Sequence, residues 1–402
     1  MTNIFYMIIP ILKLIFIVST ITQLVYWFFV FSKLAFYEKI NIPDAANYTE
    51  EGPSVPMVHF ENIGKGFGMS MSSIFLTSKP VSVVICARNE ASNLEKNLPL
   101  ILNQDYPNYE VLVVNDASTD NSAAILASFE KQYPHLKVMT IYEKKMKGKK
   151  GALALGIESS AHELLLLTDA DCYPLSKNWI SGMVNTLNNK NIGLGYAPYQ
   201  SSDSLLNRFI RFETVWTATQ YMSFALAGMP YMGVGRNMIY TKNLYKFVDG
   251  FKKHEKIMSG DDDLFVNSII TKNNFEIILN PETFMYSLPN TRWNGYITQK
   301  KRHFATATSY ILKHQIILGI LSLSHFLHFV TAFSLLALKI STIFVLLLIV
   351  ARWLTIFTFY GKILKKFQET DLLPSVLFLD VAYVFFYIIF APALAVRANK
   401  WQ

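Results

Sequence analysis

Cysteine and charged side chains are scarce in this chain of 402 residues. Only two cysteines occur, Cys86 and Cys172, and neither has the spacing of a metal-binding motif. The sequence therefore argues against a disulfide framework and against a zinc site. Charged residues make up 16% of the chain, well below the roughly 25% of an ordinary globular domain. Hydrophobic residues make up 51% and aromatic residues 14%, which suits a protein with lipid-facing surface.

Four long stretches are almost free of charge, and each is long enough to cross a bilayer as a helix, which takes about 20 apolar residues. They are residues 4–32 with Lys13 alone, 316–338 with no charge, 340–360 with Arg352 alone, and 372–396 with Asp380 alone. The first is too long for a cleaved signal peptide. Buried soluble helices are the alternative for the others. We expect one transmembrane helix within residues 1–36 and three within 313–402.

The orientation of these helices follows from the basic residues near their ends, because such residues favour the cytoplasmic side. Lys33 and Lys39 follow the first helix, and three lysines occupy the predicted loop 361–371. Both signals place the region between the first and second helices in the cytoplasm, at the cell membrane. The net charge of +8 then points to anionic lipid or a pyrophosphate rather than to nucleic acid.

The intervening region is expected to be a linker over residues 37–79 and an α/β domain over 80–312. Short apolar runs alternate with helical stretches, which predicts a parallel, doubly wound sheet. The expected strands are residues 81–86, 110–115, 137–142 and 163–168. Residues 205–226 and 295–313 mix aromatic and charged residues and suit amphipathic helices at the membrane surface, although a buried domain helix is as plausible for the first.

Polar residues follow three of the predicted strands, at the edge where such sheets bind ligands. The sharpest feature is the pair Asp169 and Asp171, which comes directly after an apolar strand. Two carboxylates at this spacing can bind magnesium or manganese and leave room for a diphosphate. A solvated turn is the alternative. Asp120 is as readily explained as a helix cap or turn residue.

These segments resemble the inverting family 2 glycosyltransferases, whose nucleotide-sugar-binding domain has the Rossmann-like GT-A fold. The resemblance covers about residues 80–310. It rests on VSVVICARNEASN, VLVVNDASTDNS, GKKGALALGI, LLLLTDADC, SGDDDLFVN and QKKRH, in the family's order.

The resemblance implies a role for each matching residue. Glu90 and Asp116 would hold the nucleoside, and Lys149 would lie near the pyrophosphate. Asp169 and Asp171 match the metal and diphosphate motif, and a UDP-sugar is the expected donor. Gln299 and Arg302 match the Q-x-x-R-W motif that frames the acceptor and the diphosphate, although His303 replaces its tryptophan.

Asp262 looks like the catalytic base in this alignment, and Asp261 or Asp263 takes that place if the register shifts by one. Displacement at an anomeric carbon needs a base for the acceptor hydroxyl and positive charge for the departing diphosphate. A helix N-terminal cap is the other explanation for these acidic residues, and both can hold. Most of the run 144–150 is expected to be a solvated loop.

The expected function is a metal-dependent hexosyltransferase that passes a sugar from a nucleotide sugar to a lipid, lipid-linked or glycan acceptor. A processive polysaccharide synthase that translocates its polymer is the first alternative. An inactive or transport-related membrane subunit is the second, and it predicts loss of acidic residues that this chain retains.

Overall fold

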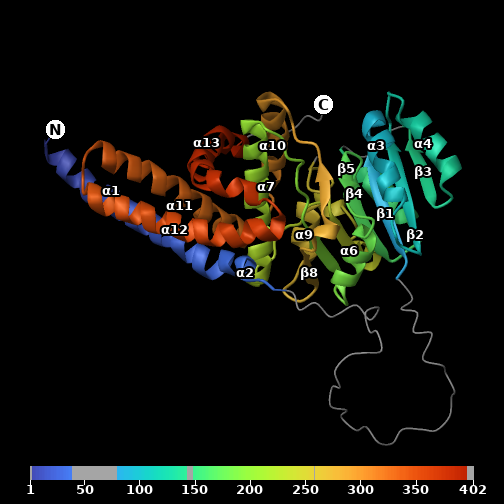
Figure 1. Cartoon of the computed structure of the whole chain (residues 1–402), viewed down its shortest axis with the longest axis horizontal. Coiled ribbons are helices and arrows are strands. Elements are labelled where there is room, and N and C mark those ends of the chain that lie inside the picture. The colour runs from blue at the N-terminus through green and yellow to red at the C-terminus, as the bar shows by residue number, and fades with distance from the viewer. Residues whose placement is uncertain (1, 39–78, 143–147, 258, 396–402) are drawn as a thin grey trace, which may run out of the picture.

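The computed structural model describes residues 2–38, 79–142, 148–257 and 259–395 (Figure 1). Most of the linker expected at 37–79, including Lys39, lies outside these residues. The described chain has two parts, which are a sheet with its covering helices and a bundle of long apolar helices.

The larger sheet has seven strands in the order β3-β2-β1-β4-β7-β6-β8. A second sheet pairs β5 with β9. The strands are β1 (Val81–Ala87), β2 (Tyr109–Asp116), β3 (Leu136–Ile141), β4 (Leu164–Asp169), β5 (Cys172–Pro174), β6 (Ile192–Gly195), β7 (Met238–Thr241), β8 (Phe275–Ile278) and β9 (Met285–Ser287). The α/β fold class expected from the sequence is confirmed, and each of the four expected strands agrees with an observed strand to within one residue at either end.

The expectation of a wholly parallel sheet is wrong in one respect. Strands β1 to β4 are mutually parallel, but β7 runs antiparallel to both of its neighbours, β4 and β6. The residues just before an antiparallel strand lie at the edge where its parallel neighbours end. The loop before β7 therefore reaches the edge that was expected to bind ligands.

The side chains of β1 alternate between the two faces of the sheet, as the period of a strand requires. Val81, Val83 and Ile85 pack with helices α3, α4 and α6, and Val84 packs on the opposite face with α5 and the helical bundle. Helices therefore cover both faces, which explains why β1 is a continuous apolar run. These helices are α3 (Ala91–Leu102), α4 (Ser122–Gln132), α5 (Lys150–Ser159) and α6 (Trp179–Leu187).

Four helices among the described residues are long and apolar enough to cross a membrane, one near the N-terminus and three near the C-terminus, as the sequence predicts. The first comprises α1 (Thr2–Val25), a π-helical segment η1 (Tyr26–Phe31) and α2 (Ser32–Ala35). The others are α11 (Leu312–Ala337), α12 (Thr342–Phe367) and α13 (Val376–Ala395), which follows the 3₁₀ segment η5 (Thr370–Ser375).

The loop expected at 361–371 is mostly helix, because α12 continues to Phe367. The three lysines of this segment therefore lie on the last turns of α12. Lys366 donates to the backbone oxygen of Tyr37 at 2.5 Å, and the Lys362 amine lies 4.8 Å from the centre of the Phe36 ring. Two lysines at the end of the third long helix thus contact the residues that directly follow the first long helix.

Helix α7 (Leu205–Leu226) stands between the sheet and the long helices (Figure 1). Sixteen of its 22 residues are buried, so it is the buried domain helix and not a surface helix. The Trp216 ring centre lies 5.2 Å from that of Phe31 and 6.1 Å from that of Trp27. A single hydrophobic core runs from these rings through α7 to Val84 of β1 and joins the two parts of the chain.

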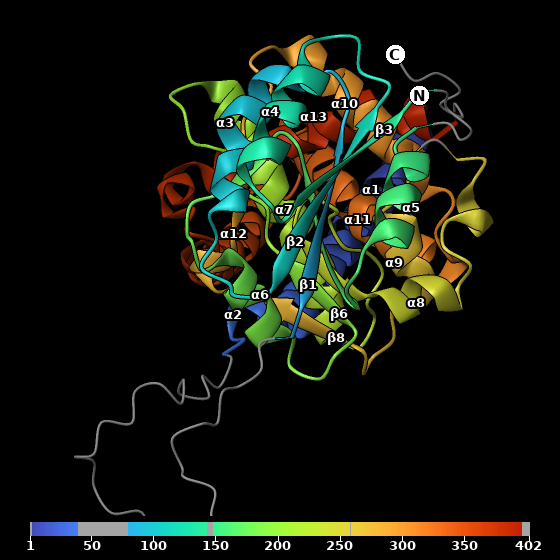
Figure 2. The ribbon, with the colours of Figure 1, turned by 90° about the vertical axis from the view of Figure 1, so that its right-hand side faces the viewer.

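The remaining helices complete the sheet domain, and the last of them leads into the second long helix. Figure 2 views the molecule from the sheet side, with the long helices behind the sheet. The remaining helical segments of the sheet domain are α8 (Lys242–Phe247), η3 (Lys252–His254), α9 (Asp263–Ile269), η4 (Pro281–Thr283) and α10 (Trp293–Ala307).

Arg352 and Asp380, the charged residues of the third and fourth predicted membrane segments, are paired with each other. Arg352 of α12 donates two hydrogen bonds to Asp380 of α13, at 2.6 and 3.2 Å, and the His325 ring of α11 lies 3.0 Å from the same carboxylate. Arg352 also reaches Gln23 of α1 at 3.3 Å. One polar cluster thus connects all four long helices, as expected for ionisable groups that face a bundle interior.

A second buried ion pair fixes the bundle to α7. The guanidinium of Arg211 donates from Nε to Glu369 at 2.8 Å and from Nη1 to Asp371 at 2.8 Å. The side chains of Arg211 and Glu369 are 4% and 5% exposed, whereas that of Asp371 is 55% exposed. The carboxylate of Glu369 therefore supplies the buried half of this contact.

We expect Glu369→Gln to lower the midpoint of thermal unfolding, because it removes the buried partner of Arg211. Breaking one side of a buried pair typically costs about 3–5 kcal/mol. Asp371→Asn is the matched control and should cost at most about 1 kcal/mol, as exposed pairs do. Thermal unfolding of the purified protein in lipid nanodiscs measures both, and equal shifts for the two variants would contradict this account.

Candidate active site

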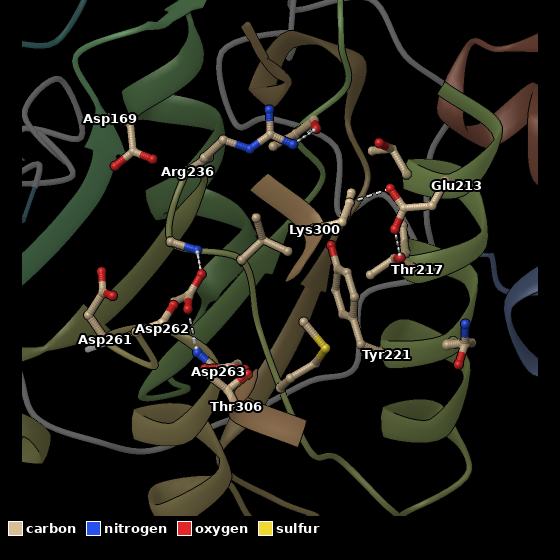
Figure 3. Close-up of a pocket in the computed structure, with 18 of the residues that line it drawn as sticks. Asp169, Glu213, Thr217, Tyr221, Arg236, Asp261, Asp262, Asp263, Lys300 and Thr306 are labelled. Atoms are coloured by element: carbon tan, nitrogen blue, oxygen red, sulfur yellow. Dashed lines mark hydrogen bonds and ion pairs between the residues drawn. The ribbon is translucent and has the colours of Figure 1, made fainter. Parts of the chain in front are cut away.

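One cavity of about 770 Å³ opens at the carboxyl ends of β1, β2 and β4. Its lining includes most of the site residues that the sequence predicts, and Figure 3 shows part of it. The predicted residues in the lining are Glu90, Asp116, Lys149, Asp169, Asp171, Asp261, Asp262 and Asp263. Residues that lie far apart in the sequence therefore meet at the expected edge of the sheet.

The loops after β1 and β2 are locked to each other. Asn89 and Ala117 have φ values of 56° and 54°, in the left-handed region that residues with a side chain rarely adopt. The Asn89 side-chain oxygen accepts from the backbone N–H of Thr119 at 2.8 Å, and the Asn89 N–H donates to the Ser118 hydroxyl at 3.0 Å. These bonds hold the strained turns that present Glu90 and Asp116 to the cavity.

Asp120 has the structural role of a cap or turn residue, which was the alternative explanation for it in the sequence. Its carboxylate accepts from the backbone N–H groups of Ala91 and Ser122, each at 3.0 Å, so it holds the starts of α3 and α4 together. Asn93 in turn donates to the Glu90 carboxylate at 2.6 Å, which leaves the other Glu90 oxygen available to a ligand. Burial raises the pKa of Glu90 above its ordinary value.

The pair Asp169 and Asp171 has the geometry of a cation site. Their carboxylate oxygens and the Cys172 sulfur lie within 4.8 Å of one another. Burial, and then the charge of Asp169, raises the pKa of Asp171, so a bound cation would relieve a repulsion that the protein otherwise carries. Burial also raises the pKa of Cys172, which keeps it a neutral thiol. Two carboxylates beside a neutral thiol fit Mg²⁺ or Mn²⁺, which prefer oxygen ligands.

Lys149 connects the two acidic clusters. Its amine forms an ion pair with Asp169 and lies 3.9 Å from Asp261. Burial alone would lower the pKa of Lys149, but these two carboxylates raise it well above its ordinary value. Lys150 was expected with the solvated loop and is instead buried, where its amine donates to the backbone oxygens of His254 and Ile257 at 2.6 and 2.8 Å.

Asp261, Asp262 and Asp263 have different surroundings. Asp263 accepts hydrogen bonds from the hydroxyls of Thr306, at 2.5 Å, and Tyr310, at 2.8 Å, so it is tied to the end of α10. Asp262 is the N-cap of α9 and accepts from the backbone N–H of Asp263 at 2.7 Å. Asp262 is therefore a helix cap and a cavity-lining residue at once.

The Asp262 carboxylate packs directly on a glycine of the loop before β7. Gly235 donates its backbone N–H to Asp262 at 2.9 Å, and a Cβ on this glycine would lie 3.1 Å from the Asp262 side chain (Figure 3). A side chain at this position would have to push the Asp262 side chain away by a few tenths of an ångström, so glycine suits this close approach. Burial, followed by the charges of Asp263 and Asp261, raises the pKa of Asp262 to about 7.

Arg236 is a site residue that the sequence-based assignment did not include. Its half-buried guanidinium donates to the backbone oxygen of Ala197 at 2.7 Å and lies 4.4 Å from the centre of the Tyr199 ring. It lines the cavity, and the charges of Asp171 and Asp169 contribute to its raised pKa. The antiparallel direction of β7, which the sequence did not predict, brings it near Asp169 and Asp171.

Helix α10 contributes differently from the expected motif. The Gln299 side chain accepts from Asn290 at 2.8 Å and is not among the residues that line the cavity. Its neighbour Lys300 does line the cavity and forms an ion pair with Glu213 of α7 (Figure 3). The side chains of Arg302 and His303 lie outside the described part of the structure.

Comparison with known proteins agrees with this geometry. Residues 82–246 match the family model described as glycosyl transferase family 2. The chain carries a family 2 glycosyltransferase domain. The expected GT-A type of nucleotide-sugar domain is thereby confirmed, and the matched segment runs from β1 through β7 into α8.

Several relatives of this domain are known. The chain is 26% identical over 243 residues to the probable glycosyltransferase YdaM of Bacillus subtilis, a match that covers 58% of this chain and 56% of that protein. It is 37% identical over 93 residues to the beta-monoglucosyldiacylglycerol synthase of a Nostoc species, covering 23% of this chain and 20% of that protein. The chain therefore spans about half the length of the first relative and a fifth of the second.

Among solved structures, the chain is similar to the mannosyltransferase PcManGT from Pyrobaculum calidifontis in complex with GDP-Man and Mn²⁺. The identity is 18% and the TM-score is 0.49, with 77% of this chain and 88% of that chain covered.

We expect Asp171→Asn to weaken Mn²⁺ binding by at least about tenfold, because the substitution removes one of the two anionic ligands that neutralise the charge of the ion. Titration calorimetry with Mn²⁺ and a nucleoside diphosphate measures this without turnover. Asp249→Asn is the control, since the Asp249 side chain is 74% exposed and remote from the cavity lining. Unchanged Mn²⁺ affinity in Asp171→Asn would rule out this metal site.

Proposed function

We propose that this chain is a membrane-bound, inverting glycosyltransferase that moves a sugar from a nucleotide sugar to a hydroxyl of a membrane lipid. The reaction would take place in the cavity at the carboxyl edge of the sheet, on the cytoplasmic side of the cell membrane. A UDP-sugar is the donor that the family resemblance favours.

The observation that carries this proposal is the extent of the cavity. Its lining begins at the acidic site and continues to Leu318, Gly319 and Ser322 of α11 and to Tyr383 and Tyr387 of α13. Both helices are long and apolar enough to cross a membrane. A lipid held between such helices can present its head to the site without leaving the bilayer. The Nostoc relative is named as the synthase of a glycolipid, which supports a lipid as the acceptor.

The donor would occupy the sheet side of the cavity. Glu90 and Asp116 would hold the nucleoside, and Lys149 and Arg236 would face the diphosphate. A divalent ion held by Asp169 and Asp171 would neutralise part of the diphosphate charge. In this assignment Arg302 of α10 keeps the role near the acceptor and the diphosphate that the resemblance implies, whereas Gln299 lies outside the cavity lining.

Asp262 would act as the base. Its carboxylate accepts the proton of the acceptor hydroxyl as the hydroxyl oxygen forms a bond to the anomeric carbon of the sugar. The bond from that carbon to the diphosphate breaks, and the nucleoside diphosphate leaves with the electron pair. Gly235 and the N-terminus of α9 hold the carboxylate in place through two backbone hydrogen bonds. Lys149 and Arg236 stabilise the negative charge of the leaving group.

The orientation rests on the positions of the basic residues. Lys33 is on the last turn of the first long helix, and Lys362 and Lys366 contact the residues that follow it. These lysines lie at the end of the bundle that adjoins the sheet domain (Figure 1). The tendency of basic residues to remain in the cytoplasm then supports a cytoplasmic active site.

The direct test is to incubate the purified chain in lipid nanodiscs with Mn²⁺ and a panel of labelled nucleotide sugars. Lipid products are then separated from polymer and from free sugar. Label in a lipid fraction supports the proposal. Label only in a long polymer would favour the polysaccharide synthase, and no transfer from any donor would contradict the enzyme.

We expect Asp262→Asn to reduce turnover by about 100- to 10,000-fold, the usual contribution of a general base, while donor affinity changes little. The substitution keeps the size of the side chain and removes its basicity. Asp261→Asn and Asp263→Asn are the matched comparisons. Near-normal turnover in Asp262→Asn with loss in a neighbouring variant would move the base to that neighbour.

We also expect kcat/KM to rise with pH through an apparent pKa of about 7. The base acts only when ionised, and burial beside two acidic neighbours raises the pKa of Asp262 to about 7. Because the carboxylates interact, this value belongs to the cluster. Initial rates from about pH 5 to about pH 9 measure it, and a rate that stays constant down to pH 5 would contradict a raised pKa.

A further inference from the structure

The part of the cavity nearest the long helices has a composition of its own. We call it the membrane-side wall and define it by Glu213 and Thr217 of α7, Lys300 of α10, Ser322 of α11 and Tyr387 of α13. It faces the position where an acceptor must lie if Asp262 is to take its proton. The net charge of the membrane-side wall therefore influences which charge the acceptor can carry.

The two charged side chains of this wall neutralise each other. Lys300 and Glu213 form an ion pair, and their side chains are only 12% and 6% exposed. The other Glu213 oxygen accepts from the Thr217 hydroxyl at 3.1 Å, and the Lys300 amine lies 5.7 Å from the centre of the Tyr296 ring. A phosphate placed here would have to compete with Glu213 for Lys300, or remain buried without a counter-charge, and both are costly.

The cations on the sheet side of the cavity are already assigned to the donor. Lys149 is paired with Asp169, and Arg236 lies near the charges of Asp169 and Asp171. In the proposed reaction both face the donor diphosphate. An acceptor that arrived with a second phosphate would also approach the acidic run 261–263, which surrounds the base with negative charge.

Uncharged hydrogen-bonding groups make up the rest of the wall. The Tyr387 hydroxyl lies 3.3 Å from the His325 ring, and the Ser322 hydroxyl and the Gln220 amide line the same cavity. Hydroxyls and amides can both donate to and accept from the hydroxyl groups of glycerol or of a sugar. A polar but electrically neutral wall is therefore complementary to a polyol and not to an anion.

We propose that the acceptor is a membrane lipid with an uncharged, hydroxyl-bearing head, and that the Glu213–Lys300 pair disfavours lipids with a phosphate head. This inference rests on the proposed function, because it concerns the acceptor of that reaction. Glu213 and Lys300 act as specificity-determining residues in this account, and Asp262 remains the base.

The test uses the full chain in nanodiscs and measures lipid binding separately from transfer. The probes are labelled diacylglycerol, a labelled monoglycosyl diacylglycerol and labelled undecaprenyl phosphate, with a nucleoside diphosphate and Mn²⁺ present. We expect wild type to bind at least one neutral lipid about 10- to 100-fold more tightly than the phosphate lipid, the range that one charged contact supplies. The two neutral probes separate a glycerol head from a sugar head.

Substitution of the ion pair tests its role. Glu213→Gln leaves the Lys300 amine without its counter-charge and should tighten binding of undecaprenyl phosphate by about tenfold or more, with less than about threefold change for the neutral lipid. Lys300→Gln should weaken binding of the phosphate lipid further, so the proposal stays testable if one variant fails to fold. Glu255→Gln, at an exposed surface position, is the matched control.

The outcomes separate this inference from the proposed function. Tighter binding of the phosphate lipid by wild type, equal binding of all three probes, or transfer to the phosphate lipid alone would overturn the neutral acceptor. If no nucleotide sugar supports transfer while the neutral lipid still binds selectively, the proposed reaction fails but the selectivity of the wall stands.

Discussion

The burial of α7 is the constraint on which the rest of this structure depends. This helix places Trp216 against the aromatic residues of the first long helix and extends the same core to β1. Its two buried charged residues form ion pairs, Arg211 with Glu369 at the start of η5 and Glu213 with Lys300 of α10. Burial of apolar surface stabilises the packing of α7 between the sheet and the long helices, and the ion pairs fix its position relative to them. The sheet edge therefore faces the bundle at a fixed distance.

The direction of one strand decides which residues share the site. Because β7 is antiparallel to β4, the loop that precedes it arrives at the edge where β4 ends. Gly235 then supports Asp262, and Arg236 lies near Asp171. A parallel strand in the same place would have brought its last residues to this edge instead. The same topology places a cationic side chain near the carboxylates of Asp169 and Asp171.

Local patterns in the sequence were sufficient for the strands β1 to β4, for the long helices and for the acidic residues that follow the strands. The run from Leu164 to Leu167 is continuous because helices cover both faces, and such a run is recognisable without any tertiary information. The direction of β7, the burial of Lys150 and the Lys300–Glu213 pair depend on contacts between distant segments. No spacing within α10 distinguishes Lys300, which lines the cavity, from Gln299, which does not.

The contact between Arg352 and Asp380 also constrains how the chain enters the bilayer during synthesis. A lone Arg or Asp at the centre of an inserting helix costs about 2.5–3.5 kcal/mol. Helices α12 and α13 follow each other in the chain, so they can leave the translocon as a hairpin whose charges are already matched. A mutation that removed either charge would then reduce the yield of inserted protein during biogenesis, before any enzyme had been assembled to lose its activity.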